Sequence, residues 1–220
     1  MFAINHAAAA LLFKKNTENR ISFFWVLLAV QFVEFLWVLF NFLGIEKTTT
    51  EDKVKFVGDI HLSYIPYSHS VLSSLIIATV AILIFRLWKN SWKLGLWIGL
   101  AFFSHIILDI ITHAKDIPLG FNNSEFIGLG HYSSLPIAGF ILETGFGLFC
   151  WWYYRGSKTL FWIILVFNLF NVTMFLPSVK GPEWYMAGKP MLIVTVILAQ
   201  IIITLFLVGK FSKKRKPFFA

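Results

Sequence analysis

The sequence has few cysteines and few charged residues. Its 220 residues include one cysteine, Cys150, so an intramolecular disulfide is excluded and cysteine usage does not indicate a redox compartment. Charged residues make up 14% of the chain and hydrophobic residues 58%. A soluble domain of this size has too little polar surface to cover so many apolar side chains. The composition therefore excludes an ordinary soluble domain and predicts a membrane protein.

The hydrophobic residues fall into long blocks, most of about the length that crosses ~30 Å of hydrocarbon as a helix. A short apolar start at residues 1–13 precedes six longer blocks, at residues 21–45, 70–88, 92–113, 135–154, 160–177 and 191–209. Lys14 and Lys15 follow the first block, whereas a cleavable signal peptide carries its positive charge before the apolar stretch, so we expect a retained, short first helix. No internal repeat or low-complexity linker divides the chain. We predict an all-α fold, a polytopic transmembrane helical bundle of about seven helices at residues 1–209, with a basic tail at residues 210–220.

Basic residues are concentrated in every second connection between the blocks. The connections after the first, third and fifth blocks and the tail contain most of them: Lys14, Lys15, Arg20, Arg86, Lys89, Lys93, Arg155, Lys158, Lys210, Lys213, Lys214, Arg215 and Lys216. In the other three connections, acidic residues offset the lysines. This positive-inside pattern predicts an outside N-terminus and a cytoplasmic C-terminus. We attribute the net charge of +8 to this topology and to contact with anionic lipid at the cytoplasmic loops and tail, not to nucleic-acid binding.

The histidines all fall on the predicted extracytoplasmic side of the bundle. They are His6, His61, His69, His105, His113 and His131. Three carboxylates, Glu34, Asp109 and Glu143, lie within predicted helices. Ionisable groups inside lipid cost a few kcal/mol each on insertion scales, so they usually face the bundle interior and have partners. Glu34 and Glu143 can alternatively be protonated and pair with polar groups of other helices.

The block at residues 92–113 places three ionisable residues on one helical face. His105, Asp109 and His113 are spaced i, i+4 and i+8. Imidazole nitrogens and carboxylate oxygens together suit a divalent ion such as zinc or manganese, with one position left for water. Such a metal lowers the pKa of the water, and a neighbouring carboxylate can take its proton. This block therefore predicts a metal site with hydrolytic chemistry.

Other polar residues have a plainer interpretation. An interfacial histidine is more often a snorkelling or capping residue than a ligand, which applies to His61 and His131 and in part to His113. Whether His61, His131 and the glutamate of the fifth block belong to the site stays open. Ser68 and Ser104 each precede a histidine, but neighbours in sequence point in different directions on a helix. We expect these serines to cap or pack helices rather than to act as nucleophiles.

These residues, in this order, resemble a bacterial family of small inner-membrane proteins known as membrane-bound metal-dependent hydrolases. The resemblance covers residues 1–155 and is carried by three motifs: Asn5–His6, then Tyr67–Ser68–His69–Ser70, and Ser104–His105–Ile106–Ile107–Leu108–Asp109 followed by Thr112. Glu143 falls where a glutamate often occurs in the family. The family's Pro-Asp-x-Asp motif is replaced by the single carboxylate of Glu34, without a preceding proline.

The resemblance and the residues together imply a metal-dependent hydrolase of the bacterial cytoplasmic (inner) membrane. We expect His69, His105 and Asp109 to bind the metal, zinc or alternatively manganese, with His6 as the fourth ligand. Glu34 or His113 is the candidate acid or base. A site at this depth indicates a lipid-like or lipid-linked substrate with an ester, phosphoester or amide bond.

Two other functions remain open on the sequence. A divalent-metal transporter needs polar or ionisable groups through the inner half of the bilayer. The predicted cytoplasmic halves of the blocks contain no acid and no histidine, which favours an enzyme. The third hypothesis is a non-catalytic membrane module in which the polar cluster only holds the helices together.

Overall fold

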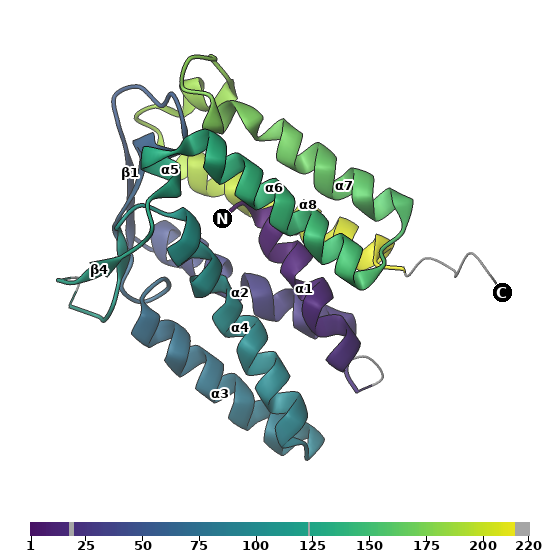
Figure 1. Ribbon diagram of the computed structural model, residues 1–220. Coiled ribbons are helices and arrows are strands. Elements are labelled where there is room, and N and C mark those ends of the chain that lie inside the picture. Colours follow the sequence, from purple (N-terminus) through teal and green to yellow (C-terminus); the bar gives the residue numbers. More distant parts are fainter. Residues whose placement is uncertain (18–19, 123, 214–220) are drawn as a thin grey trace.

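The chain folds as a helical bundle, which confirms the all-α part of the predicted fold (Figure 1). The computed structural model describes residues 1–17, 20–122 and 124–213. Seven longer α-helices correspond in order to the seven apolar blocks: α1 (Ala3–Thr17), α2 (Phe23–Phe42), α3 (Val71–Lys89), α4 (Trp92–Thr112), α6 (Pro136–Tyr154), α7 (Lys158–Phe170) and α8 (Pro190–Phe211). The eighth, α5 (His131–Ser134), is a single turn in a connection.

Local sequence signals set the ends of the long helices. Serine hydroxyls accept hydrogen bonds from first-turn backbone N–H groups of α2, α3, α4 and α7, through Ser22, Ser70, Ser91 and Ser157. Proline begins α6 and α8, where its missing N–H costs nothing. Asn90 and Arg155 end α3 and α6 in the left-handed conformation, with φ of 49° and 58°. These two residues turn the chain sharply into the next helix.

Helix α1 lies at the centre of the bundle (Figure 1). It contacts α2, α4, α6, α7 and α8, and its side chains from Ala7 to Leu11 are at most 1% exposed. Alanine side chains allow neighbouring helices to approach closely, which favours a run of four alanines at a central position. Val26, Ile98 and Leu160 of the surrounding helices complete this apolar core.

The closest helix pair is α3 with α4, because glycines of α4 face α3. A Cβ atom on Gly95 would lie 2.6 Å from the Ile82 carbonyl oxygen, and one on Gly99 would lie 2.4 Å from the Ile82 side chain. Only glycine permits this approach. The pair therefore positions α4, which contains the predicted metal-binding motif, against α3.

Within the described residues, four helices are long and apolar enough to cross a membrane, namely α2, α3, α4 and α8. Helix α7 is apolar but has only 13 residues. The apolar block at residues 160–177 had predicted a longer helix. The α-helix instead ends at Phe170, and a 3₁₀ turn, η2 (Val172–Phe175), follows. Hydropathy reports the length of an apolar run, not the point at which its backbone leaves the helix.

The two ends of the bundle differ in their connections. At one end, short strands pair antiparallel, β1 (Lys47–Thr50) with β2 (Ile60–Tyr64) and β3 (Ile117–Pro118) with β4 (Phe126–Ile127), beside the 3₁₀ turns η1 (Val57–Asp59) and η3 (Pro182–Met186) (Figure 1). At the opposite end the turns are short and basic, and Lys14 Nζ donates to the Ser212 carbonyl oxygen at 2.7 Å. Of the predicted basic tail, Lys210 and Phe211 belong to α8, while residues 214–220 lie outside the described residues.

Candidate metal centre

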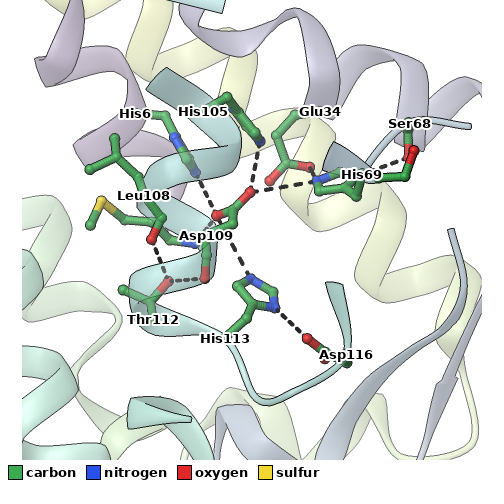
Figure 2. Close-up of polar contacts among 12 residues, drawn as sticks. His6, Glu34, Ser68, His69, His105, Leu108, Asp109, Thr112, His113 and Asp116 are labelled. Carbon is green, nitrogen blue, oxygen red and sulfur yellow. Dashed lines mark hydrogen bonds and ion pairs between the residues drawn. The ribbon is translucent and has the colours of Figure 1, made fainter. Parts of the chain in front are cut away.

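The predicted metal ligands come together at the end of the bundle that contains the strands. His6 comes from α1, His69 from the turn before α3, and His105 and Asp109 from α4 (Figure 2). All four are at most 3% exposed. Glu34 of α2 joins them, and its side chain is 14% exposed. Two overlapping groups have donor atoms within 4.8 Å of one another: His6, His105 and Asp109, and Glu34, His69 and His105.

The Asp109 carboxylate is the centre of the cluster. Its Oδ1 lies 3.1 Å from His6 Nε2, and its Oδ2 lies 3.1 Å from His105 Nε2 and 3.8 Å from His69 Nε2. The Met1 ammonium also approaches Oδ1, at 2.5 Å. One ammonium and three imidazole nitrogens thus surround a carboxylate that is 1% exposed, and a buried charge of this kind needs a cation or proton donors as partners.

His105 is oriented by the backbone of α2. Its Nδ1 lies 2.9 Å from the Val30 carbonyl oxygen, which can only accept, so Nδ1 carries the proton and Nε2 of the neutral ring has a lone pair. That lone pair faces Asp109 Oδ2 at 3.1 Å, and neither atom has a hydrogen-bond partner among the described residues. Two buried acceptors this close need a cation or an additional proton between them. A divalent metal fits this requirement.

His69 is oriented through a serine hydroxyl. The Ser68 hydroxyl donates to Glu46 Oε2 at 2.5 Å. The Ser68 oxygen therefore accepts from His69 Nδ1, 2.8 Å away (Figure 2). This arrangement leaves the His69 Nε2 lone pair directed at Asp109 and Glu34. Glu46 also accepts from the Ser68 and Tyr67 backbone N–H groups. Burial raises the pKa of the Glu46 carboxyl above its usual value, and the hydrogen bonds from Ser68 and Tyr67 offset only part of this increase.

His6 is oriented less completely. Its ring stacks on His105 with centroids 3.8 Å apart and planes at 10°. Its Nε2 lies 3.1 Å from Asp109, but its buried Nδ1 has no hydrogen-bond partner in the described part of the chain. No neighbour therefore fixes the tautomer that a metal bound at Nε2 requires.

The two predicted acid–base residues line a cavity of about 230 Å³ beside the cluster. Glu34 Oε2 lies 4.0 Å from His69 Nε2 at the cavity wall. His113 follows the last residue of α4, and its Nε2 lies 3.8 Å from Asp109 Oδ1 while its Nδ1 lies 3.7 Å from Asp116 Oδ1 (Figure 2). Both side chains can therefore contact a molecule in the cavity and the buried cluster.

Glu143 belongs to a separate hydrogen-bond network. Its Oε2 accepts from the Phe2 backbone N–H at 2.9 Å and from Asn5 Nδ2 at 2.7 Å, and its Oε1 accepts from the Tyr132 hydroxyl. Asn5 and Asn168 exchange amide hydrogen bonds of 2.9 and 3.1 Å. This network fastens α1 to α5, α6 and α7. Glu143 has its donors there and does not join the metal-ligand groups.

The remaining histidines also lie outside the cluster. His61, on β2, pairs with exposed Glu51 at 2.9 Å, and its own side chain is 46% exposed. His131 Nδ1 bonds the Ile111 carbonyl oxygen at 2.6 Å, at the start of α5. These contacts fit the interpretation of His61 and His131 as interfacial residues rather than metal ligands. His61 nevertheless lines the cavity.

The sequence did not identify the residues that orient the ligands. Glu46 lies in a connection without periodic spacing, where the sequence indicates no contact with a histidine. Ser68 had been expected to cap or pack a helix, but the cap of α3 is Ser70, two residues later. Ser104 does pack on its own helix, where it donates to the Ala101 carbonyl oxygen at 2.8 Å. Of the two serines in the Tyr-Ser-His-Ser motif, Ser70 thus caps α3 and Ser68 is the hydrogen-bond partner of His69.

The donor set fits a divalent transition metal in its chemistry as well as in its spacing. Imidazole nitrogens and carboxylates are the ligands of zinc- and manganese-type sites, and hydrogen bonds to the outer nitrogens of ligating histidines are typical of such sites. Comparisons with protein-family models, with curated proteins and with solved structures gave no match. Any assignment of function therefore depends on this geometry.

Proposed function

We propose that this chain is a metal-dependent hydrolase of the bacterial cytoplasmic membrane and a member of the family that it resembles. The observation that carries the proposal is the pair of facing acceptors, His105 Nε2 and Asp109 Oδ2, 3.1 Å apart and buried. Glu34 and His69, which complete the second donor group, also line the adjoining cavity, so a bound molecule reaches the cluster. A purely structural cluster has no need of such access.

The proposed topology has seven crossings, with the N-terminus outside and the C-terminus in the cytoplasm. The separation of charge along the bundle supports it. The last turns of α1, α3 and α8, at the end opposite the strands, contain basic residues: Lys14, Lys15, Arg86, Lys89 and Lys210. Basic ends are retained in the cytoplasm, which would place the cluster toward the extracytoplasmic leaflet.

His69, His105 and Asp109 would hold the metal, zinc in the first instance, with His6 completing the set. A metal of this kind polarises a carbonyl or phosphoryl oxygen and lowers the pKa of water to near neutrality. Glu34 is positioned to take a proton at its Oε2, on the cavity wall 4.0 Å from His69. His113, between Asp109 and Asp116, is positioned to return a proton to the leaving group.

A transporter is less well supported, because the bundle is closed below the cluster. The core around Ala7–Leu11 of α1 is apolar and at most 1% exposed. Val26, Ala29 and Ile98 fill the facing positions on α2 and α4. An ion leaving the cluster toward the basic end meets no histidine or carboxylate among the described residues of this core. A one-sided site that is open to a cavity is the arrangement an enzyme requires.

The decisive experiment compares metal content, turnover and metal flux in one preparation. Purified full-length protein should contain close to stoichiometric zinc or manganese and should hydrolyse an amphiphilic ester, phosphoester or amide in detergent or nanodiscs. A chelator should abolish turnover and added metal should restore it. Metal flux into sealed proteoliposomes, sensitive to His105→Ala and without lipid turnover, would instead establish a transporter. Bound metal with neither activity would mean a structural cluster.

A further inference from the structure

The cavity beside the cluster follows α8 for about two turns. One face of that helix lines it with residues spaced i, i+3, i+4 and i+7, namely Ile193, Val196, Ile197 and Gln200. At 1.5 Å rise per residue, this wall extends ~10 Å along the helix axis. Trp37 of α2, which is 2% exposed, and Met174 of η2 are among the other apolar lining residues. The shape and lining suit a linear hydrocarbon chain.

The lining contains residues of the cluster, a pair of amides and an exposed aromatic side chain. The cluster contributes Glu34, His69 and His113 to the lining. Elsewhere, Gln200 Nε2 donates to Asn171 Oδ1 at 3.2 Å, so these two amides partly satisfy each other. Phe170 also lines the cavity and is 66% exposed at the end of α7, so this part of the wall faces the surroundings of the bundle. A chain from the surrounding lipid would therefore enter beside α7 with its polar group toward the cluster.

The charge of the lining selects against anionic ligands. The lining includes the carboxylates Glu34, Asp116 and Glu183 and three histidines, but no lysine or arginine among the described lining residues. The Met1 ammonium, which also lies at the lining, is paired with the Asp109 carboxylate at 2.5 Å. Glu183 is 2% exposed and accepts from Thr173 Oγ1 at 2.9 Å and from the Gly181 N–H at 3.1 Å. Sites that bind phosphoryl groups usually supply arginine or lysine to hold their charge. An uncharged carbonyl needs no such partner.

From this shape and charge we infer that the cavity binds the acyl chain of a neutral carboxylic ester or amide, not a phosphoester. The binding step follows from the cavity alone, whereas the reaction rests on the proposed hydrolase function. In that reaction the hydroxyl of water joins the acyl carbon and the acyl carbon–oxygen or carbon–nitrogen bond breaks. The remaining proton goes to the alcohol or amine. The products are a carboxylic acid and an alcohol or amine.

Binding is tested on metal-free full-length protein in nanodiscs, by quenching of Trp37 fluorescence with a bromine-labelled acyl chain. The probes are methyl bromo-octanoate and bromo-octyl phosphate. The fluorescence of the other tryptophans is measured in Trp37→Phe and subtracted. The neutral ester should quench the Trp37 signal at about tenfold lower concentration than the phosphate. Val196→Phe, which narrows the cavity, should weaken quenching about tenfold, whereas Ala199→Phe, at an exposed position of the same helix, should not. Equal or tighter binding of the phosphate, or no Trp37-dependent quenching, would overturn the inference.

Turnover separates this inference from the proposed function. Metal-loaded protein is given para-nitrophenyl octanoate and octyl para-nitrophenyl phosphate, which have the same chain and the same leaving group. Faster hydrolysis of the octanoate than of the phosphodiester supports the inference. In Val196→Phe, whose cavity is narrower, the rate with the octanoate should fall relative to the rate with the shorter para-nitrophenyl butanoate. Hydrolysis of the phosphodiester alone would confirm a hydrolase and overturn the neutral acyl site. Quenching by the ester without hydrolysis of either compound would support the acyl site and contradict the hydrolase.

Discussion

The Ser68 hydroxyl lies 2.5 Å from the Glu46 carboxylate and fixes the direction in which His69 presents its lone pair. A histidine ligand whose outer nitrogen is held by such a partner binds metal more tightly, by roughly 10–100-fold in known sites. The chain thus brings a carboxylate from the start of one connection to the histidine at its end. Neither Ser68 nor Glu46 is among the ligand groups, but both determine how one ligand is oriented.

The first prediction concerns this contact. Ser68→Ala should weaken zinc binding by about 10–100-fold, measured by competition with a chromophoric chelator, while Ser68→Thr retains the hydroxyl and should restore most of the affinity. Glu46→Gln should weaken binding in the same direction. Ser133→Ala, at an exposed serine of α5, is the matched control. Unchanged affinity in Ser68→Ala would mean that the contact serves only the fold of the connection.

The residues of the site differ in how far the sequence could predict them. His105 and Asp109 lie on one helix at i and i+4, so periodicity places them together whatever the rest of the chain does. Glu46 and Ser68 are 22 positions apart in a connection built from strands, where no helical period relates them. Their contact depends on the path of β1 and β2. Likewise, the end of α7 depends on capping contacts around Asn171, which an apolar block does not encode.

The second prediction orders the ligands by how well each is held. His105→Ala and Asp109→Ala should lose the metal, because too few donors remain for tight binding. His6→Ala should retain more, because the His6 ring has no partner at Nδ1 among the described residues. Elemental analysis after gel filtration measures the difference, with Lys180→Ala, in the connection between η2 and η3, as the control. Equal metal content in wild type and His105→Ala would make the α4 pair structural.

The third prediction separates Glu143 from the metal site. Glu143→Gln leaves metal content unchanged but disturbs hydrogen bonds from Phe2, Asn5 and Tyr132, at a cost of about 1–3 kcal/mol for a buried group. Thermal unfolding in detergent should therefore begin at a lower temperature. Glu125→Gln, at an exposed position, should unfold like the wild type. Loss of metal from folded Glu143→Gln would instead extend the site to α6.

The fourth prediction tests topology by labelling with an impermeant maleimide, in a Cys150→Ala background. Single cysteines at Glu51 and Asn122, both exposed at the end with the strands, should react in intact spheroplasts. Ser212 would be an unsuitable cytoplasmic probe, because it is 5% exposed and bonded by Lys14 and Tyr154. Lys213→Cys, at an exposed position, replaces it and should react only after permeabilisation. The reverse labelling would place all six histidines toward the cytoplasm.

The fifth prediction distinguishes two roles for Glu34. Its Oε2 lies 4.0 Å from His69 Nε2, within one of the two donor groups, and its side chain also reaches the cavity. If Glu34 is the general base, Glu34→Gln should reduce turnover by about 10²–10⁴-fold with metal still bound, because the amide keeps the shape but cannot take a proton.

If Glu34 is instead a ligand, the same variant should lose metal as well as turnover. Metal content and rate must therefore be measured on one sample. Glu51→Gln, at a carboxylate that is 61% exposed beside His61, is the control for a change of charge at this end of the bundle. A variant with full metal and full turnover would exclude Glu34 from both roles and leave His113 as the residue positioned to exchange protons at the cavity wall. His113→Gln should then reduce turnover where Glu34→Gln did not.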